Sequence, residues 1–338
     1  MPKNIKPTYI DLFAGIGGFR VGMDHAGFQH LYSNDWDKYA SQTYEAWYGP
    51  ENHSCKSIWD AIAEKEIPDH DILCGGFPCQ PFSNAGKRLG FQDNRQGNLF
   101  FAIKDIVEAK RPKVVFLENV RTLKGHDKGN TFKTINDVFE ELDYHETHEV
   151  ISAKFWVPQN RVRIFMVYLD KNIFTEEDKL NFQAELTKLK DGNNKKVKAF
   201  SSIMEANPDK SYEIPKGTWE SLKKHRARHR EAGRGFGYKL LEDYSQATNT
   251  LSARYAKDGA EILINQQDWE RPRKITLNEA KKLMGFNNKY ASFYDHKSRA
   301  GFPVGICSNA QSYKQFGNAV VPQIVHEIGD LIQNLCKM

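Results

Sequence analysis

Short apolar runs alternate with amphipathic stretches along roughly the first half of the chain. The apolar runs cover residues 9–13, 30–34, 71–74, 113–118, 149–153 and 163–169, and helical periodicity covers 18–26, 38–48, 98–110 and 131–142. Strands and helices in regular alternation are typical of a parallel sheet covered by helices on both faces. The sequence therefore predicts an α/β fold, with this sheet built from residues 1 to about 170.

The pattern changes twice after this region. Beyond Lys171 the alternation gives way to polar sequence, and a helical pattern returns from Ile275 onward. Residues 320–335 are predicted to form a closing helix, because Pro322 suits the first turn of a helix. We expect three parts: a large domain over 1–175, a smaller and less regular domain over 180–272, and a segment over 273–338 that returns to the large domain.

Composition excludes several classes of protein. Hydrophobic residues make up 40% of the 338 residues and charged residues 27%, which is ordinary for a globular protein. No apolar run is long enough to span a membrane, and the first residues form no apolar signal segment, so we expect a cytoplasmic protein. The cysteines are odd in number and never spaced Cys-x-x-Cys, so we expect free thiols, no disulfide framework and no metal site; they are Cys55, Cys74, Cys79, Cys307 and Cys336.

A basic segment covers residues 221–240. It holds seven Lys and Arg residues and one Glu, so its net charge is +6 while the rest of the chain sums to −1. Such a run is ordinarily a solvated face. The glycines and aromatic residues interleaved at 233–238 favour instead a surface that binds phosphates and carries stacking or wedge side chains. This segment predicts polyanion binding.

A glycine-rich turn follows the first apolar run, in the sequence Asp-Leu-Phe-Ala-Gly-Ile-Gly-Gly-Phe-Arg at 11–20. Nucleotide-binding sheets carry such a turn at their first crossover, although a dinucleotide fingerprint fails here because Arg20 takes the place of its third glycine. Asp35 could accept hydrogen bonds from ribose hydroxyls, and Trp36 could stack on an adenine. The alternative is a turn that serves only tight packing. We expect an adenosine-type cofactor without a pyrophosphate.

Cys79 follows another apolar run and lies between two prolines. Ligands of an open parallel sheet bind beyond the carboxyl ends of its strands, so this thiol is expected at the mouth of the cofactor crevice. A lone cysteine is ordinarily a core residue, which is the interpretation for Cys74 within the strand. Pro78 and the glycines at 75–76 indicate instead an exposed, rigid loop from which a Cys79 thiolate can attack.

Glu118 ends a further apolar strand, where burial is expected to raise its pKa and suit it to proton donation. A helix cap or an ion pair is the ordinary alternative. Arg161 and Arg163, at a spacing of two, are expected on one side of the strand that follows. Such arginines usually form surface ion pairs, but near a thiol and a carboxylate they could hold a base or a phosphate.

The order of these motifs is similar to that of the DNA cytosine-5 methyltransferases. Over nearly the whole chain one finds, in turn, the glycine turn at 11–20, Pro78-Cys79-Gln80, Glu118-Asn119-Val120, Gln159-x-Arg161-x-Arg163, a variable basic region and Gln315-Phe316-Gly317-Asn318-Ala319-Val320. The resemblance implies a Rossmann-like S-adenosylmethionine-dependent methyltransferase sheet with a smaller, irregular target-recognition domain at 180–272. The product of the cofactor would be S-adenosylhomocysteine.

The resemblance also implies roles for individual residues. Catalysis would use Cys79 as nucleophile, Glu118 on the cytosine ring, Arg163 on O2 of the base, and Arg161 to help fix the base. The cofactor would contact Phe13, Ala14, Gly15, Gly17, Gly18, Asp35, Trp36, Pro78, Leu99 and Asn318. DNA would contact Gln80, Ser83, Lys87, Arg88, Lys223, Arg226, Arg228, Arg230, Arg234 and Tyr238. The loop at 83–90, with two glycines and two cations, would close on the DNA.

The chain departs from the family pattern at two positions. The Asp-Ile pair that contacts the cofactor adenine is not evident, and either Ser57 or Asp60 could substitute for it. Asp35 stands where the family often has Glu, and either carboxylate can accept hydrogen bonds from ribose hydroxyls.

The sequence leaves alternative functions to be separated. Beside a DNA methyltransferase stand a tRNA cytosine-5 methyltransferase of the same superfamily, a nicotinamide oxidoreductase and a catalytically inactive DNA-binding module. The basic segment favours double-stranded DNA, the missing third glycine opposes the oxidoreductase, and the complete set of catalytic residues opposes the inactive module. We expect a monomer of bacterial or phage origin whose genetic partner is a cognate restriction endonuclease.

Overall fold

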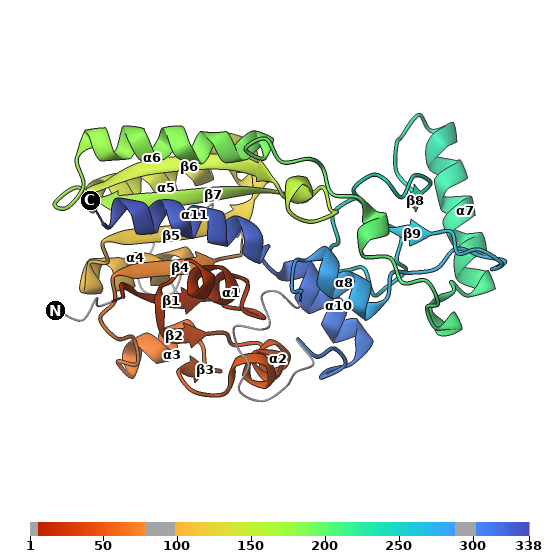
Figure 1. Ribbon diagram of the computed structural model, residues 1–338, viewed down its shortest axis with the longest axis horizontal. Coiled ribbons are helices and arrows are strands. Elements are labelled where there is room, and N and C mark those ends of the chain that lie inside the picture. The colour runs from red at the N-terminus through yellow and green to blue at the C-terminus, as the bar shows by residue number, and fades with distance from the viewer. Residues whose placement is uncertain (1–5, 79–98, 288–301, 338) are drawn as a thin grey trace, which may run out of the picture. The chain divides into compact units, whose positions relative to one another are not determined.

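The computed structural model describes residues 6–78, 99–287 and 302–337, and the chain divides into two compact units (Figure 1). Unit 1 comprises Met1–Ser152, Val162–Asn193 and Val320–Met338, and unit 2 comprises Ala153–Arg161 and Asn194–Ala319. The chain thus leaves unit 1 twice and returns to it twice. The functional domains expected from the sequence, at 1–175, 180–272 and 273–338, stay a prediction.

Unit 1 is built on a seven-stranded sheet in the order β3-β2-β1-β4-β5-β7-β6. All six strands expected from the sequence are present, and the short β3 was not expected. The predicted α/β fold is confirmed. The strands are β1 (Thr8–Leu12), β2 (Gln29–Asn34), β3 (His53–Ser54), β4 (Ile72–Gly76), β5 (Val114–Val120), β6 (Tyr144–Ser152) and β7 (Val162–Asp170).

The expectation of a parallel sheet is wrong at β7, which runs antiparallel to both β5 and β6. The segment 153–161 that joins β6 to β7 holds a single 3₁₀ turn, Ala153–Phe155. A connection between parallel strands needs a crossover of about a dozen residues or more, usually a helix. A connection this short reverses the chain, and β7 enters the sheet between β5 and β6.

Helices cover both faces of the sheet, and alternate strand residues point to one face or the other. On one face Leu73 and Leu117 join a core cluster with α3, α4 and α5. On the other face Phe116 packs edge-on against Phe19 of α1, with ring centroids 5.0 Å apart. The helices of unit 1 are α1 (Gly18–His25), α2 (Lys38–Tyr48), α3 (Ile58–Ala63), α4 (Leu99–Lys110), α5 (Asn130–Glu141), α6 (Glu176–Lys188) and α11 (Pro322–Leu335).

Glycines bring the backbones of α1 and α11 into close contact. A Cβ on Gly22 would lie 2.5 Å from Cβ of Val325, and one on Gly329 would lie 2.7 Å from Cβ of Ala26. Separations below about 3.0 Å are not tolerated, so larger side chains would force the helices apart. The predicted closing helix at 320–335 is present, with Pro322 in its first turn.

Unit 2 contains α7 (Lys216–Glu231), α8 (Leu277–Leu283), α10 (Asn309–Asn318) and a pair of short parallel strands, β8 (Leu240–Leu241) and β9 (Leu263–Ile264). Arg273 and Glu279 form an ion pair at 2.7 Å, and both side chains are fully buried. Glu279 also closes a capping box with Thr276 at the start of α8. Losing one partner would leave an uncompensated buried charge, so this pair holds α8 to the strand region.

No helix in the described part of the chain is long and apolar enough to cross a membrane.

Arg20 is the centre of a polar network on the α1 face of the sheet. Its Nε lies 2.6 Å from the Asp24 carboxylate, and its Nη1 lies 2.6 Å from Nδ1 of His30. Arginine only donates, so Nδ1 of His30 must accept and the ring must be neutral. Burial, and then the charge of Arg20, lower the pKa of His30 from 6.5 to about 2.

We expect the His30 ring to make unfolding depend on pH. The pKa of His30 in the folded state lies below its value in the unfolded state. The ring's contribution to the free energy of unfolding is therefore present above pH 6.5 and is lost as the pH falls. Between pH 7 and 5 this loss is about 2 kcal/mol. His30→Asn keeps an acceptor for Arg20 but cannot titrate. Urea unfolding from pH 7.5 to 5 should show a steeper loss of stability in the wild type than in the variant. Parallel curves would show that His30 does not titrate on unfolding.

Candidate active site

Within the glycine-rich motif at 11–20, residues 13–18 form the turn that joins β1 to α1. Phe13, Gly15 and Gly17 all have positive φ, at 56°, 56° and 80°. This conformation is strained for Phe13 and costs little at the two glycines, so bonds from outside must hold the turn. One of these comes from Asp35, whose Oδ2 accepts the N–H of Gly15 at 2.8 Å.

Asp35 and Trp36 give this turn the features of an adenosine site. The Asp35 carboxylate also accepts the N–H of Asp37 at 2.8 Å, and a carboxylate can accept about four hydrogen bonds in all. The indole of Trp36 is 76% exposed, and a Cβ on Gly15 would meet nothing within 4 Å. An open backbone face, a carboxylate and an exposed aromatic face fit a ribose and an adenine.

The other residues expected at the cofactor lie in different surroundings. Ala14, Gly17 and Gly18 are buried in the turn, and Pro78 is exposed just after β4. Leu99 opens α4 and packs against the core cluster. Asn318, in unit 2, is exposed at the end of α10.

The two candidates for the adenine contact both lie at the start of α3. Ser57 is the N-cap residue of this helix, and its Oγ accepts the N–H of Trp59 at 3.3 Å. Asp60 is exposed in the first turn. The choice between them stays a prediction.

Glu118 and Arg163 form an ion pair at the end of β5. Arg163 Nε lies 3.1 Å from Glu118 Oε1, and the side chains are 16% and 9% exposed, respectively. Val120 is the direct partner of Arg163 across the strands, so Glu118 is its diagonal neighbour on the same face. The reversal of β7 therefore creates this pair. Glu118 Oε2 also lies 3.5 Å from the position of a Cβ on Gly76, at the end of β4.

Asn119 is a residue for which the sequence indicated no separate role. Its Nδ2 donates to the backbone oxygen of Phe77 at 2.9 Å, and both groups are buried. The side chain thus ties the end of β5 to the residue that precedes Pro78. A buried polar residue at the tip of an apolar strand is the signal that could have identified it.

Arg161 differs from the expectation that it shares one side of a strand with Arg163. β7 begins at Val162, and Arg161 precedes it as part of unit 2. Its guanidinium is 2% exposed and donates to the backbone oxygens of Leu251, Gly317 and Ala319 at 2.9–3.1 Å. Because these donors bind backbone carbonyl groups, Arg161 fixes the backbone at the end of α10.

Five of the expected site residues lie outside the described residues. They are the proposed nucleophile Cys79 and the proposed DNA contacts Gln80, Ser83, Lys87 and Arg88.

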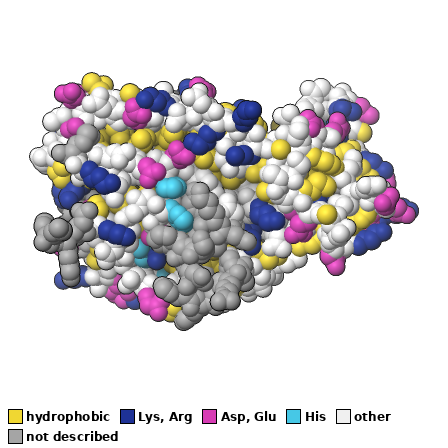
Figure 2. Space-filling view, in the orientation of Figure 1, with side chains coloured by type: hydrophobic (Ala, Val, Ile, Leu, Met, Phe, Trp, Pro, Cys, Tyr) yellow, Lys and Arg dark blue, Asp and Glu magenta, His cyan; other side chains and the backbone are white. Residues whose placement is uncertain are grey.

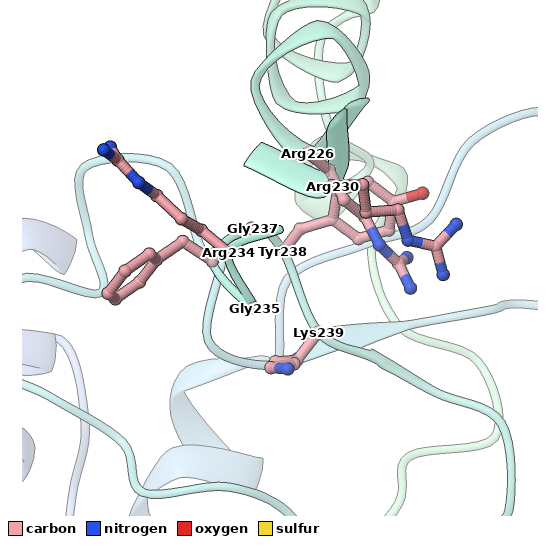
Figure 3. Close-up of a pocket in the computed structure, with 8 residues that line it drawn as sticks. Arg226, Arg230, Arg234, Gly235, Gly237, Tyr238 and Lys239 are labelled. Atoms are coloured by element: carbon pink, nitrogen blue, oxygen red, sulfur yellow. The ribbon is translucent and has the colours of Figure 1, made fainter. Parts of the chain in front are cut away.

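The basic segment forms the greater part of α7 and the loop after it. Of its seven cations only Lys223 forms an ion pair within the described residues, at 2.7 Å from Glu220. Arg226, Arg230, Arg234 and Lys239 line a pocket of about 210 Å³ together with the loop at 235–238. Figure 3 shows Arg226 and Arg230 extending from α7 beside Tyr238. Several cations around one hollow create a positive potential that favours anions.

The two aromatic residues of the loop have different surroundings. The ring of Tyr238 lies between Trp219, at 4.8 Å, and the Arg226 guanidinium, at 4.5 Å, and it packs on a small core with Ile214. Phe236 is 67% exposed. Tyr238 is therefore held by its neighbours, and Phe236 is the aromatic side chain that faces solvent.

The sheet, the glycine turn with its acidic partner, and the carboxylate–arginine pair define the class of S-adenosylmethionine-dependent methyltransferases. Within this class, the chain belongs to the C-5 cytosine-specific DNA methylases, whose family model matches residues 8–334. The enzyme is a DNA (cytosine-5-)-methyltransferase and S-adenosylmethionine is its methyl donor, as the motif order predicted.

Two relatives show how far the similarity extends. The chain is 44% identical to the Type II methyltransferase M1.ScrFI of Lactococcus lactis subsp. cremoris, over 97% of this chain and 78% of that one. It is 42% identical to M.SsoII of Shigella sonnei, over 98% and 82% of the two chains. The similarity to DNA methyltransferases favours DNA over tRNA as the substrate.

A solved structure shares the fold at low identity. The Dnmt2 methyltransferase of S. pombe aligns with a TM-score of 0.68 at 18% identity, over 98% of this chain and 99% of that one. This likeness confirms the methyltransferase fold.

Glu118→Gln is expected to lower turnover by about 100- to 10,000-fold while the protein still folds and binds DNA, because the amide keeps the shape but removes the transferable proton. Turnover at saturating DNA and the melting temperature are measured on the same preparation. Glu213→Gln is the matched control, since Glu213 is also 9% exposed and pairs with an arginine, Arg271, at 2.7 Å. The control should lower the melting temperature only. Near-normal turnover of Glu118→Gln would remove Glu118 from the mechanism.

Proposed function

We propose that this chain methylates C5 of a flipped-out cytosine within a specific short sequence of double-stranded DNA. The ion pair of Glu118 and Arg163 carries the proposal, because it presents an acid–base group and a planar donor together at the tip of β5. The Type II names of the relatives support a role as the modifying enzyme of a bacterial or phage restriction-modification system. A cognate restriction endonuclease would then be its genetic partner, and the enzyme would act as a cytoplasmic monomer.

The cofactor is proposed to lie on the glycine turn. Asp35 would bind the ribose hydroxyls and Trp36 the adenine, with Phe13, Ala14, Gly15, Gly17, Gly18, Pro78, Leu99 and Asn318 completing the pocket. Bound S-adenosylmethionine supplies an electrophilic methyl group.

C5 of cytosine is too weak a nucleophile to accept this methyl group unaided. The Cys79 thiolate is proposed to add to C6, which moves electron density to C5. Glu118 would share a proton with N3 and bind the exocyclic amine, and Arg163 would donate to O2. Both groups stabilise the negative charge that develops on the ring. Arg161 would act as a positioning residue through the backbone of 317–319.

The reaction ends when the C5 proton passes to solvent water. The electrons of that C–H bond reform the C5–C6 double bond and expel the thiolate from C6. The target atoms are out of reach inside a duplex, so the base must leave the stack, which costs a few kcal/mol. Contacts with the surrounding DNA must offset this cost.

We expect Cys79 to form a covalent complex with DNA that carries 5-fluorocytosine at the target position, in the presence of S-adenosylmethionine. Fluorine cannot leave as a proton does, so the adduct persists and is visible on a denaturing gel. Cys55→Ser, which changes an exposed cysteine, is the control and should trap DNA like the wild type. An equal yield from Cys79→Ser would show that another group is the nucleophile.

The DNA backbone is proposed to bind along α7 and the loop that follows. On the face that Figure 2 shows, Lys and Arg side chains are interspersed with Asp and Glu across unit 1. On α7, by contrast, six Lys and Arg residues outnumber two Glu residues, and within the described residues only Lys223 forms an ion pair. The proposed contacts are Lys223, Arg226, Arg228, Arg230, Arg234 and Tyr238, joined by Gln80, Ser83, Lys87 and Arg88, which follow β4 in the sequence and lie outside the described residues.

Arg230→Gln and Arg234→Gln are each expected to weaken binding to all DNA sequences. Each variant should lower the slope of log affinity against log salt by about 0.9, because one phosphate contact releases about one counterion. Lys133→Gln is the control, since Lys133 on α5 is exposed and pairs with Asp137 at 2.5 Å. Fluorescence anisotropy at several salt concentrations gives the slopes. Unchanged slopes for both arginine variants would place the backbone contacts elsewhere.

A further inference from the structure

The hydroxyl of Tyr48, in the last turn of α2, contacts the glycine turn. It donates to the backbone oxygen of Ile16 at 3.0 Å and lies 3.4 Å from that of Gly17. Its ring fills the space beside Gly17, where a Cβ would lie 2.6 Å from Cε2 of the tyrosine. Tyr48 therefore fixes one carbonyl of the turn and closes one of its sides.

The start of α2 contacts the same turn through Asp35. This carboxylate binds the N–H of Gly15 and the N–H of Asp37, and Asp37 is itself the N-cap residue of α2. Two peptide groups of the turn, with one peptide group between them, are thus bound by residues at the two ends of α2. A side chain that points back along its helix lets the last turn reach this far.

Neighbouring side chains hold the ring of Tyr48 in place. The rings of Tyr44 and Tyr48 lie 4.6 Å apart, and the Arg20 guanidinium lies 5.6 Å from the Tyr48 ring centroid. Burial raises the pKa of the phenol well above 10, so the hydroxyl donates at every working pH. A fixed donor of this kind reduces the number of conformations open to the turn.

We propose that Tyr48 is a positioning residue for the cofactor, holding the glycine turn in its binding conformation without touching the bound molecule. The proposal rests on the glycine turn being the cofactor site. A turn with three positive φ angles has other accessible conformations, and a bond that excludes them raises affinity by preorganisation. Tyr48 thus acts on cofactor binding and leaves the acid–base chemistry to Glu118.

Tyr48→Phe removes the hydroxyl and keeps the ring beside Gly17. Its dissociation constants for S-adenosylmethionine and S-adenosylhomocysteine, measured by calorimetry on the full chain, should rise about 3- to 10-fold, as for one lost hydrogen bond. KM for S-adenosylmethionine should rise by the same factor, while kcat at saturation and DNA affinity stay unchanged.

Two further variants give this experiment its controls. Tyr144→Phe removes a buried bond of the same kind, from the phenol to the backbone oxygen of Pro112 at 2.6 Å, and should leave cofactor affinity unchanged. Trp36→Ala removes the exposed aromatic face and tests whether the cofactor binds at the glycine turn. Equal losses of affinity in Tyr48→Phe and Tyr144→Phe would overturn the proposal, because destabilisation alone would then explain them.

The remaining outcomes separate the two proposals. If Trp36→Ala weakens cofactor binding and Tyr48→Phe does not, the positioning role is wrong and the site stands. If neither variant changes the dissociation constant, the site and the role of Tyr48 are both wrong. A lower kcat with an unchanged KM in Tyr48→Phe would also overturn the proposal.

Discussion

The contact between α1 and α11 is the constraint on which the rest of unit 1 depends. Gly22 and Gly329 let the two backbones approach until a single added methyl group would collide. Through this contact α11 covers one side of α1. The position of α1 is thereby fixed, and with it the glycine turn that leads into this helix. The sheet, the turn and the Glu118–Arg163 pair all belong to this one closed unit.

The proposed tasks of the enzyme are divided between the two units. Among the described residues, those proposed to act on the cytosine ring and on the cofactor lie mainly in unit 1, on strand ends and a tight turn that are fixed by packing. Most of the proposed backbone contacts lie in unit 2, on α7 and the loop after it. In this exposed helix six Lys and Arg residues outnumber two Glu residues. Catalysis requires fixed geometry, whereas binding to phosphates requires positive charge on long side chains. Each unit has the physical character that its task requires.

The sequence predicted most of the fold because periodicity and turn residues are local signals. Strand positions, the glycine turn, Asp35 and Glu118 were all identifiable in this way. The reversal of β7 was not predicted, although the short segment between β6 and β7 carried the signal. The buried bonds of Arg161 and the contact of Tyr48 with Ile16 join residues far apart in the chain. No local pattern encodes such contacts, since they depend on how helices and strands pack.

The packing of α11 on α1 also has a consequence for synthesis of the enzyme. At translation rates of about 5–20 residues per second, the roughly 300 residues between these helices take about 15 to 60 s to make. Throughout that interval the apolar side of α1 lacks its partner helix, while β1, β2 and β4 are already available to pair. A nascent chain must therefore keep this surface from aggregating, and the proposed cofactor turn gains its support only once α11 has left the ribosome.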